Sequence, residues 1–260
     1  MSENSYETIK TLLASERPEE LRRGLELARL EISRVGSTEA KPLFEIVSTI
    51  FCIDPLDRPD LVSVMDEAIS LVAGFGDLLI PALLESLDTG DIKAQLAISH
   101  ALGRIGEDAI DPLIAYYEAS SDPARCQFIL YAMGKIKSPK IVAAAHIALE
   151  AAQSPNLELR HTATRAIGKF VESIPPSDLS EKLKQAFVER LQSSLADPDP
   201  GIRAKAIRGF GKLARYGHLS ATEREKLKTL CRFIMGVDEN FDWDRAYIVR
   251  KEAEEALQYT

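Results

Sequence analysis

The stretch Asp199-Pro200-Gly201-Ile202-Arg203-Ala204-Lys205-Ala206-Ile207-Arg208-Gly209-Phe210-Gly211 decides how this chain folds. It begins with an aspartate, whose side-chain oxygen can accept a free backbone N–H at the start of a helix. Ala206, Gly209 and Phe210 then fall on one helical face. The stretch therefore predicts an amphipathic helix with a narrow stripe of small apolar side chains.

The end of this helix is one copy of a pattern that recurs along the chain. An apolar residue, a small residue and a basic residue follow one another, as in Leu102-Gly103-Arg104, Met133-Gly134-Lys135, Ile167-Gly168-Lys169 and Phe210-Gly211-Lys212. With weaker copies included, the small residues stand at positions 33, 73, 103, 134, 168, 211 and 258, which are 30 to 47 residues apart. Self-similarity at this period is typical of a stacked repeat array.

Helix starts and turns recur in phase with this pattern. The residue twelve positions before the glycine can cap a helix in the four best copies: Asp91, Asp122, Asn156 and Asp199. Turn sequences such as Ser154-Pro155 and Asp197-Pro198 occupy the same place in each copy. We predict seven helix pairs, with first helices at about 6–14, 39–53, 77–88, 107–119, 138–152, 178–196 and 221–236. The second helices are expected at about 18–35, 58–74, 91–105, 122–136, 156–173, 199–216 and 243–258.

The stretch 199–211 resembles the second helix of a HEAT repeat, in particular the phycobilin-lyase-type HEAT-like variant. The shared features are Asp-Pro, an arginine, a run of alanines and a final apolar-Gly-x-apolar motif. The resemblance covers roughly residues 60–260, with a degenerate extension over 1–59. It implies an all-α fold, an α-α superhelix (a HEAT-like solenoid), in which second helices line the concave surface. It also implies that the helix arginine bonds a turn aspartate; Arg160, Arg203 and Arg250 fit this role, whereas Gln95 and Cys126 depart from it.

Domain organisation follows from how repeats are stabilised. A single helix pair cannot bury its apolar face, but stacked pairs share a continuous core. We therefore expect one solenoid over residues 1–260, with degenerate repeats at 1–59, the best repeats at 60–219 and a capping repeat at 220–260.

Composition narrows the classes of partner and compartment. The 260 residues carry a net charge of −8, which disfavours general nucleic-acid affinity. Residues 154–219 are the exception, with 11 basic and seven acidic side chains. No apolar run reaches the length of a membrane span. The three cysteines Cys52, Cys126 and Cys231 contain no Cys-x-x-Cys pair, so we expect reduced thiols in a cytoplasmic protein.

Motifs for chemistry are absent from the sequence. HEAT-repeat deoxyhypusine hydroxylases are marked by His-Glu dipeptides that bind iron, and this chain has none. It also lacks a Gly-x-Ser-x-Gly nucleophile motif. We therefore expect no enzyme activity, no cofactor and no bound metal.

A series of cations stands out among the repeats. A basic residue follows the small residue in five copies, and a second lies one helical turn earlier in two. Near a helix C-terminus these charges can simply complement the helix dipole. Alternatively, they line a groove that attracts an anionic partner. Under that second interpretation the partner-binding residues are Arg104, Lys135, Arg165, Lys169, Arg208 and Lys212.

These observations favour a non-enzymatic scaffold or adaptor. We expect it to bind a protein or peptide through the concave face, with an acidic or phosphorylated segment as the best-suited partner. A subunit resembling the phycobilin lyases, which handle a tetrapyrrole, is the alternative. A nucleic-acid-binding protein resembling HEAT-like DNA glycosylases is the third. The partner's identity and the oligomeric state stay open.

Overall fold

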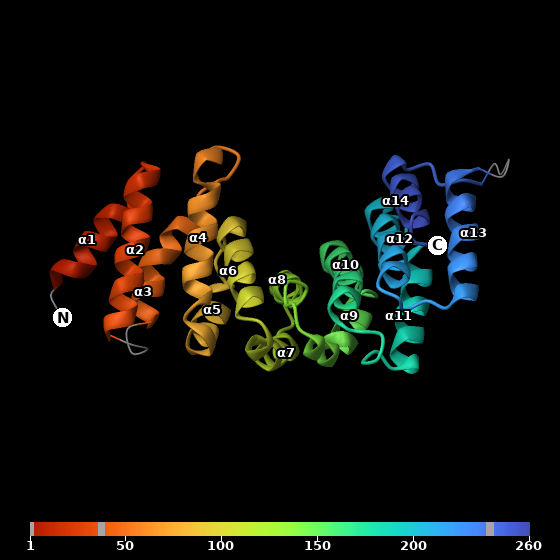
Figure 1. Ribbon diagram of the computed structural model, residues 1–260, viewed down its shortest axis with the longest axis horizontal. Helices are drawn as coiled ribbons and strands as arrows, with labels where there is room; N and C mark the ends of the chain where they lie inside the picture. Colours follow the sequence, from red (N-terminus) through yellow and green to blue (C-terminus); the bar gives the residue numbers. More distant parts are fainter. Residues whose placement is uncertain (1–2, 36–39, 238–241) are drawn as a thin grey trace. The chain divides into compact units, whose positions relative to one another are not determined.

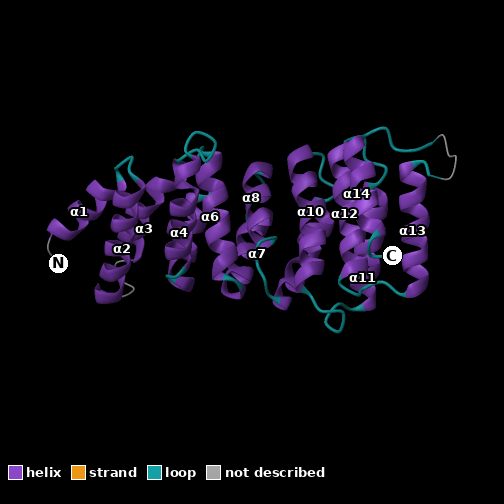
Figure 2. Ribbon diagram, turned by 45° about the horizontal axis from the view of Figure 1, so that its top comes forward, coloured by secondary structure: helices purple, strands orange, loops and turns teal. Residues whose placement is uncertain are grey.

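The structure is a computed structural model that describes residues 3–35, 40–237 and 242–260. In these ranges the chain consists of α-helices joined by short 3-10 helices and loops, and contains no strand (Figure 2). The predicted all-α fold is confirmed. Within the described residues no single helix is long and apolar enough to span a membrane; only the bent pair Pro59–Ala73 and Gly76–Ser86, at 102°, passes on length and composition.

The chain divides into two compact units, Met1–Tyr116 and Tyr117–Thr260. Within the first unit the second helices of successive pairs pack together, α2 on α4 and α4 on α6. The helices of this unit are α1 Glu3–Leu13, α2 Pro18–Val35, α3 Ala40–Val47, α4 Val62–Ala73, α5 Ile80–Ser86 and α6 Ile92–Ile105. Helix α7, Ile110–Glu118, crosses the boundary between the units.

The second unit repeats this arrangement with more regular helices. Helix α10 packs between α8 and α12, and α12 packs on α14 (Figure 1). The helices are α8 Pro123–Met133, α9 Ala145–Ala151, α10 Leu157–Ser173, α11 Glu181–Ser194, α12 Pro200–Arg215, α13 Ala221–Met235 and α14 Tyr247–Leu257. That the two units form one continuous array over 1–260 stays a prediction.

The observed helices lie close to the predicted helix pairs. In several first helices, however, the α-helical part is shorter than predicted. Three of them begin with a 3-10 segment, at Gly76–Leu79, Glu107–Ala109 and Pro139–Ala144. In two of these helices a proline, Pro81 or Pro112, stands in the first turn of the α-helical part. Because proline has no N–H, an α-helix that began earlier would lose a backbone hydrogen bond there.

The predicted caps and core positions are confirmed. Asp91, Asp122, Asn156 and Asp199 each accept backbone N–H groups at the start of a second helix. The apolar residues before the repeat glycines, which are Leu102, Met133, Ile167 and Phe210, are buried. Each second helix therefore contributes its narrow apolar stripe to the core.

Two arginines link successive repeats of the second unit. Arg160 donates to Asp197 of the next turn at 2.7 Å and to the Ser154 carbonyl of its own turn at 2.8 Å. Arg203 repeats both bonds, with Asp244 at 2.7 Å and the Asp197 carbonyl at 2.9 Å. We call these two pairs the Arg–Asp ladder.

The other residues at this helix position keep only the bond to the turn. Gln95 donates to the Leu87 carbonyl at 2.8 Å, and the Cys126 thiol lies 3.7 Å from the Ser120 carbonyl. Arg250 donates to the Asp244 carbonyl at 2.8 Å. The departures at Gln95 and Cys126 thus lose the ion pair and retain the backbone contact.

Candidate binding site

The structure places the six predicted binding residues in both units. Arg104 belongs to the first unit, where it forms an ion pair with Asp66 and donates to the Ser70 hydroxyl. These contacts tie α6 to α4. The other five residues belong to the second unit and lie on α10, on α12 and in the turn after α8: Lys135, Arg165, Lys169, Arg208 and Lys212.

The cations of α10 and α12 lie on one side of these helices because of their spacing. On α12, Lys205, Arg208, Lys212 and Arg215 are three or four residues apart and therefore form a row along the helix. Helices α10, α12 and α14 lie side by side (Figure 1). We define the basic face as Lys135, Arg165, Lys169, Lys205, Arg208, Lys212 and Arg215.

One half-buried carboxylate, that of Glu172, lies among the lysines of this face. Glu172 is 2.6 Å from the Lys212 ammonium and 2.9 Å from that of Lys169, and Lys137 approaches to 3.6 Å. Burial alone raises the pKa of Glu172, but the hydrogen bonds from Lys212 and Lys169 outweigh it and lower the pKa to about 2. Glu172 is therefore ionised at neutral pH and neutralises only part of the surrounding charge.

The lysines of this cluster also repel one another. Burial lowers the pKa of Lys212; Glu172 opposes this effect, and nearby Lys169 and Arg208 lower the pKa further. Like charges act in this direction because they disfavour the protonated amine. The face is thus electropositive even with Glu172 in place.

A second carboxylate bounds the face on α14. Glu252, only 4% exposed, forms an ion pair with Arg208. A pocket of about 430 Å³ lies between α12 and α14 and is lined by Arg208, Lys212, Arg215, Glu252, Glu255 and Tyr259, among others. The two helices pack closely beside this pocket, because a Cβ placed on Gly211 would lie 3.1 Å from the Cβ of Ala256.

Three cations of the face have an aromatic partner and no carboxylate among the described residues: Arg215, which lies over Tyr216 and Tyr259, and the pair Lys135 and Arg165. The Lys135 ammonium lies 4.9 Å from the ring centre of Tyr131, and the Arg165 guanidinium lies 5.2 Å from it. Among the described residues neither forms an ion pair with Asp or Glu. A ring attracts a cation without neutralising it, so Lys135 and Arg165 keep their full charge for a ligand.

The structure also shows a packing role for the Gly-Lys motif. A Cβ placed on Gly168 would lie 3.4 Å from Cδ of Lys212, and one on Gly134 would lie 3.8 Å from Cβ of Lys169. Each lysine stem thus crosses the glycine of the preceding repeat. Lys212 and Arg104 also stand in the last turns of their helices, where they complement the dipole, whereas Lys169 does not.

Sequence reasoning missed the carboxylates of this site. The i, i+3 spacing of Lys169 and Glu172 is a signal that could have identified that pair. No comparable signal connects Arg208 with Glu252, which is 44 residues away. Sequence reasoning also missed Tyr131, whose ring contacts Lys135 of its own repeat and Arg165 of the next one.

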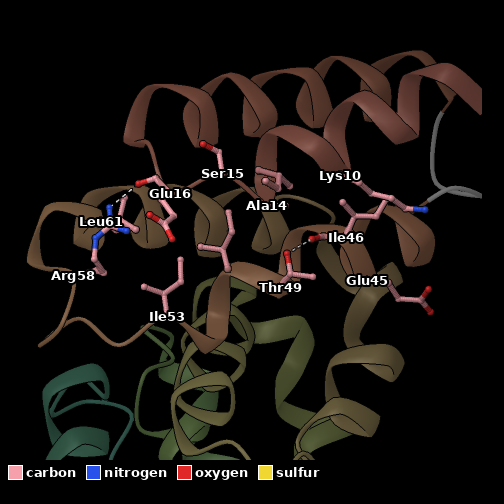
Figure 3. Close-up of a pocket in the computed structure, with 12 residues that line it drawn as sticks. Lys10, Ala14, Ser15, Glu16, Glu45, Ile46, Thr49, Ile53, Arg58 and Leu61 are labelled. Atoms are coloured by element: carbon pink, nitrogen blue, oxygen red, sulfur yellow. Dashed lines mark hydrogen bonds between the residues drawn. The ribbon is translucent and has the colours of Figure 1, made fainter.

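A larger pocket in the first unit contains none of the predicted residues. It measures about 660 Å³ and lies between the end of α1, α3 and the 3-10 segments that follow (Figure 3). Ile46, Ile53 and Leu61 form an apolar wall, with Lys10 and Arg58 at separate places on its border. Arg58 is already held by Asp60 and by the Glu16 carbonyl. This pocket therefore combines an apolar wall with charged side chains, which include the carboxylates of Glu16 and Glu45.

No group of three or more His, Cys, Asp or Glu side chains that could hold a metal occurs in residues 3–35, 40–237 and 242–260. The amines and guanidinium groups of the basic face are groups that can hold an anion by charge-assisted hydrogen bonds.

Comparison with known proteins supports the fold. No protein-family model matches the chain. No curated protein sequence matches it either. Kap121p bound to Nup53p is similar with a TM-score of 0.63 and 13% identity, over 97% of this chain and 29% of that one. CpcE and CpcF of phycocyanin lyase from Nostoc sp. PCC7120 give a TM-score of 0.53 and 21% identity, over 68% of this chain and 97% of that one.

An engineered protein matches over nearly the full length of both chains. Its TM-score is 0.51 and its identity 19%, with 100% of this chain and 98% of that one covered. At such identities the likeness concerns the fold, and a shared repeat fold hosts many functions. The sequence resemblance is thereby confirmed in structure, and the chain has the all-α fold of the HEAT-like repeat proteins.

Proposed function

We propose that this protein is a non-enzymatic scaffold or adaptor that binds an acidic or phosphorylated protein segment through the basic face. One observation carries the proposal: seven cations share this face, and among the described residues only three of the seven, Lys169, Lys212 and Arg208, form ion pairs with a carboxylate. The three free thiols, Cys52, Cys126 and Cys231, support a cytoplasmic setting, in which thiols stay reduced.

The physical state of the cations supports binding. Lys169, Arg165 and Lys212 are half-buried, so they lose less hydration on contact with a ligand than fully exposed lysines would. Arg165 and Lys135 are held over Tyr131 and need little ordering when a partner arrives. A carboxylate or phosphate placed beside them gains charge-assisted hydrogen bonds.

The charge of the surface changes sign from α12 to α14. Glu252 and Glu255 stand at the α14 positions that correspond to Lys205 and Arg208 on α12. A bound segment that is acidic over α10 and α12 therefore encounters negative charge at α14. We expect the preferred segment to carry a basic residue beyond its acidic stretch.

The test uses charge reversal at residues whose loss leaves no carboxylate unpaired. From sequence alone, reversal of Lys169, Arg208 and Lys212 would weaken binding with little effect on unfolding. The structure changes that design, because Arg208 and Lys212 neutralise Glu252 and Glu172. The sharper variant is Lys135→Glu with Arg165→Glu.

In affinity capture from cell lysate, the wild-type protein should retain a set of acidic partners at low salt and lose them at high salt. The Lys135→Glu/Arg165→Glu variant should retain about tenfold less of the same partners, consistent with loss of two charge-assisted contacts. The control is Lys182→Glu with Lys226→Glu, two exposed lysines on α11 and α13. Equal retention by both variants would contradict the proposal.

A tetrapyrrole-handling subunit is the second candidate, because the CpcE and CpcF structure is among the similar folds. The experiment is an absorbance scan of the purified protein after incubation with a bilin. A new visible band that survives gel filtration, and that the basic-face variant lacks, would favour this candidate over the adaptor.

A further inference from the structure

Three polar side chains form a line at the start of α12, and one of them, Lys205, belongs to the basic face. Nε2 of His161 lies 2.6 Å from Oδ1 of Asp199, and Nδ1 of His161 lies 2.5 Å from the Lys205 amine. His161 belongs to α10, whereas Asp199 and Lys205 flank the first turn of α12. The imidazole thus connects a carboxylate with an amine.

The carboxylate determines how the imidazole is used. An ionised aspartate can only accept hydrogen bonds, so Nε2 carries the proton that it donates to Asp199. The neutral ring then has its lone pair on Nδ1, directed at the lysine amine. Burial raises the pKa of Asp199, but the bonds from His161 and the Ile202 N–H outweigh it, and the pKa lies below its usual range.

The position of the imidazole is built into the backbone. Asp199 is the N-cap of α12 and also accepts the Ile202 N–H at 3.0 Å, which fixes its carboxylate. A Cβ on Gly201 would lie 2.6 Å from Cε1 of His161. Only a glycine at this position lets the ring lie against the first turn of α12.

The surroundings of Lys205 make its amine easier to deprotonate than that of an exposed lysine. Burial lowers the pKa of Lys205, and nearby Arg165 and Arg208 lower it further against the opposite effects of Asp199 and Glu158. Arg208 is paired with Glu252, whereas Arg165 forms no ion pair among the described residues. An electrophile that carries negative charge would therefore find a free guanidinium close to the amine.

We propose that Lys205 is a nucleophilic lysine that is acylated by small acyl phosphates, with His161 as the proton acceptor. The amine nitrogen attacks the acyl carbon and forms a C–N bond. The C–O bond to phosphate breaks, and phosphate leaves with the electron pair. The amine proton passes to Nδ1 of His161, and Asp199 stabilises the resulting imidazolium. Arg165 holds the phosphate. This site shares Lys205 and Arg165 with the basic face, but the reaction does not require a bound partner.

The experiment treats the full-length protein with acetyl phosphate and follows acetylation of each lysine by peptide mass spectrometry over time and pH. Lys205 should react at least about tenfold faster than exposed Lys226 at neutral pH, a ratio within the range of general-base assistance. His161→Gln should remove this advantage at neutral pH, with the rate recovering at high pH where the amine loses its proton to solvent. Arg165→Gln should lower the rate of Lys205 acetylation by acetyl phosphate more than the rate of its acetylation by a neutral acetyl ester.

Controls separate positioning from folding. His146→Gln changes an exposed histidine on α9 and should leave the Lys205 rate unchanged. Gly201→Ala should displace the imidazole and lower the Lys205 rate, while circular dichroism verifies that the helices persist. Acetylation of Lys205 no faster than that of Lys226, or a rate that His161→Gln does not alter, would overturn the proposal.

Discussion

The two ends of the second helices in the second unit use the same kinds of charged residue with different results. At their N-terminal ends, Arg160 and Arg203 are each matched by one aspartate of the next turn. Further along α10 and α12, cations outnumber the carboxylates that they contact. Charge balance, more than the number of arginines and lysines, therefore separates the structural end from the end available to a partner.

The ladder end is built for stability. Arg203 meets Asp244 with two bonds, at 2.7 and 3.0 Å, and also caps two turn carbonyls. The arginine holds the next repeat in place through this set of bonds. On the basic face, by contrast, the stems of Lys169 and Lys212 pack over glycines while their ammonium groups share one carboxylate.

The largest effect is expected from breaking the ladder. Arg203→Ala leaves the mostly buried Asp244 carboxylate without its partner and two carbonyls without a donor. The free energy of unfolding should fall by about 4 kcal/mol, as for other broken buried pairs. Urea unfolding measures it. Arg245→Ala, which removes an exposed arginine that lies over the Trp243 ring, should cost less than about 1 kcal/mol. Similar losses in both variants would contradict the assigned role.

The next effect concerns Glu172 and pH. Its pKa of about 2 in the fold lies below the ordinary 4.5, so it stabilises the fold fully above pH 4.5. This stabilisation is lost as the pH falls from about 4.5 to 2, and it amounts to about 3 kcal/mol. Glu172→Gln should flatten the dependence of unfolding on pH in that window.

The control for this titration is Glu225→Gln, which changes an exposed carboxylate on α13 paired with Lys228. Its unfolding should follow the wild-type pH dependence. If Glu172→Gln left the acid limb of the curve unchanged, the lysines would not be holding Glu172 ionised, and the assigned charge balance of the basic face would be wrong.

A smaller effect distinguishes two glycines of neighbouring repeats. A Cβ on Gly209 would lie 2.8 Å from buried Leu191, whereas one on Gly168 meets nothing closer than 3.4 Å. Gly209→Ala should therefore lower the free energy of unfolding by about 1 to 2 kcal/mol through overpacking. Gly168→Ala should raise it by up to about 1 kcal/mol through helix propensity. Thermal unfolding of the two variants side by side checks the contrast in sign.

Local patterns were sufficient to predict most of the fold. Asp199 as a cap and Phe210 as a core residue follow from positions within a single helix. The 3-10 starts of several first helices follow less directly, because they depend on where a proline interrupts the backbone bonds. The partners of the cations were the hardest to predict from the sequence. Arg208 and Glu252 lie 44 residues apart, and the packing of α12 on α14 brings them together.

The most direct test of the central claim is a titration with a fluorescent peptide of consecutive glutamates, followed by anisotropy at low salt. We predict that the wild-type protein and Lys182→Glu/Lys226→Glu bind it alike, whereas Lys135→Glu/Arg165→Glu binds about tenfold more weakly at an unchanged melting temperature. Equal affinity in all three proteins would show that the basic face is not the surface that takes an acidic partner.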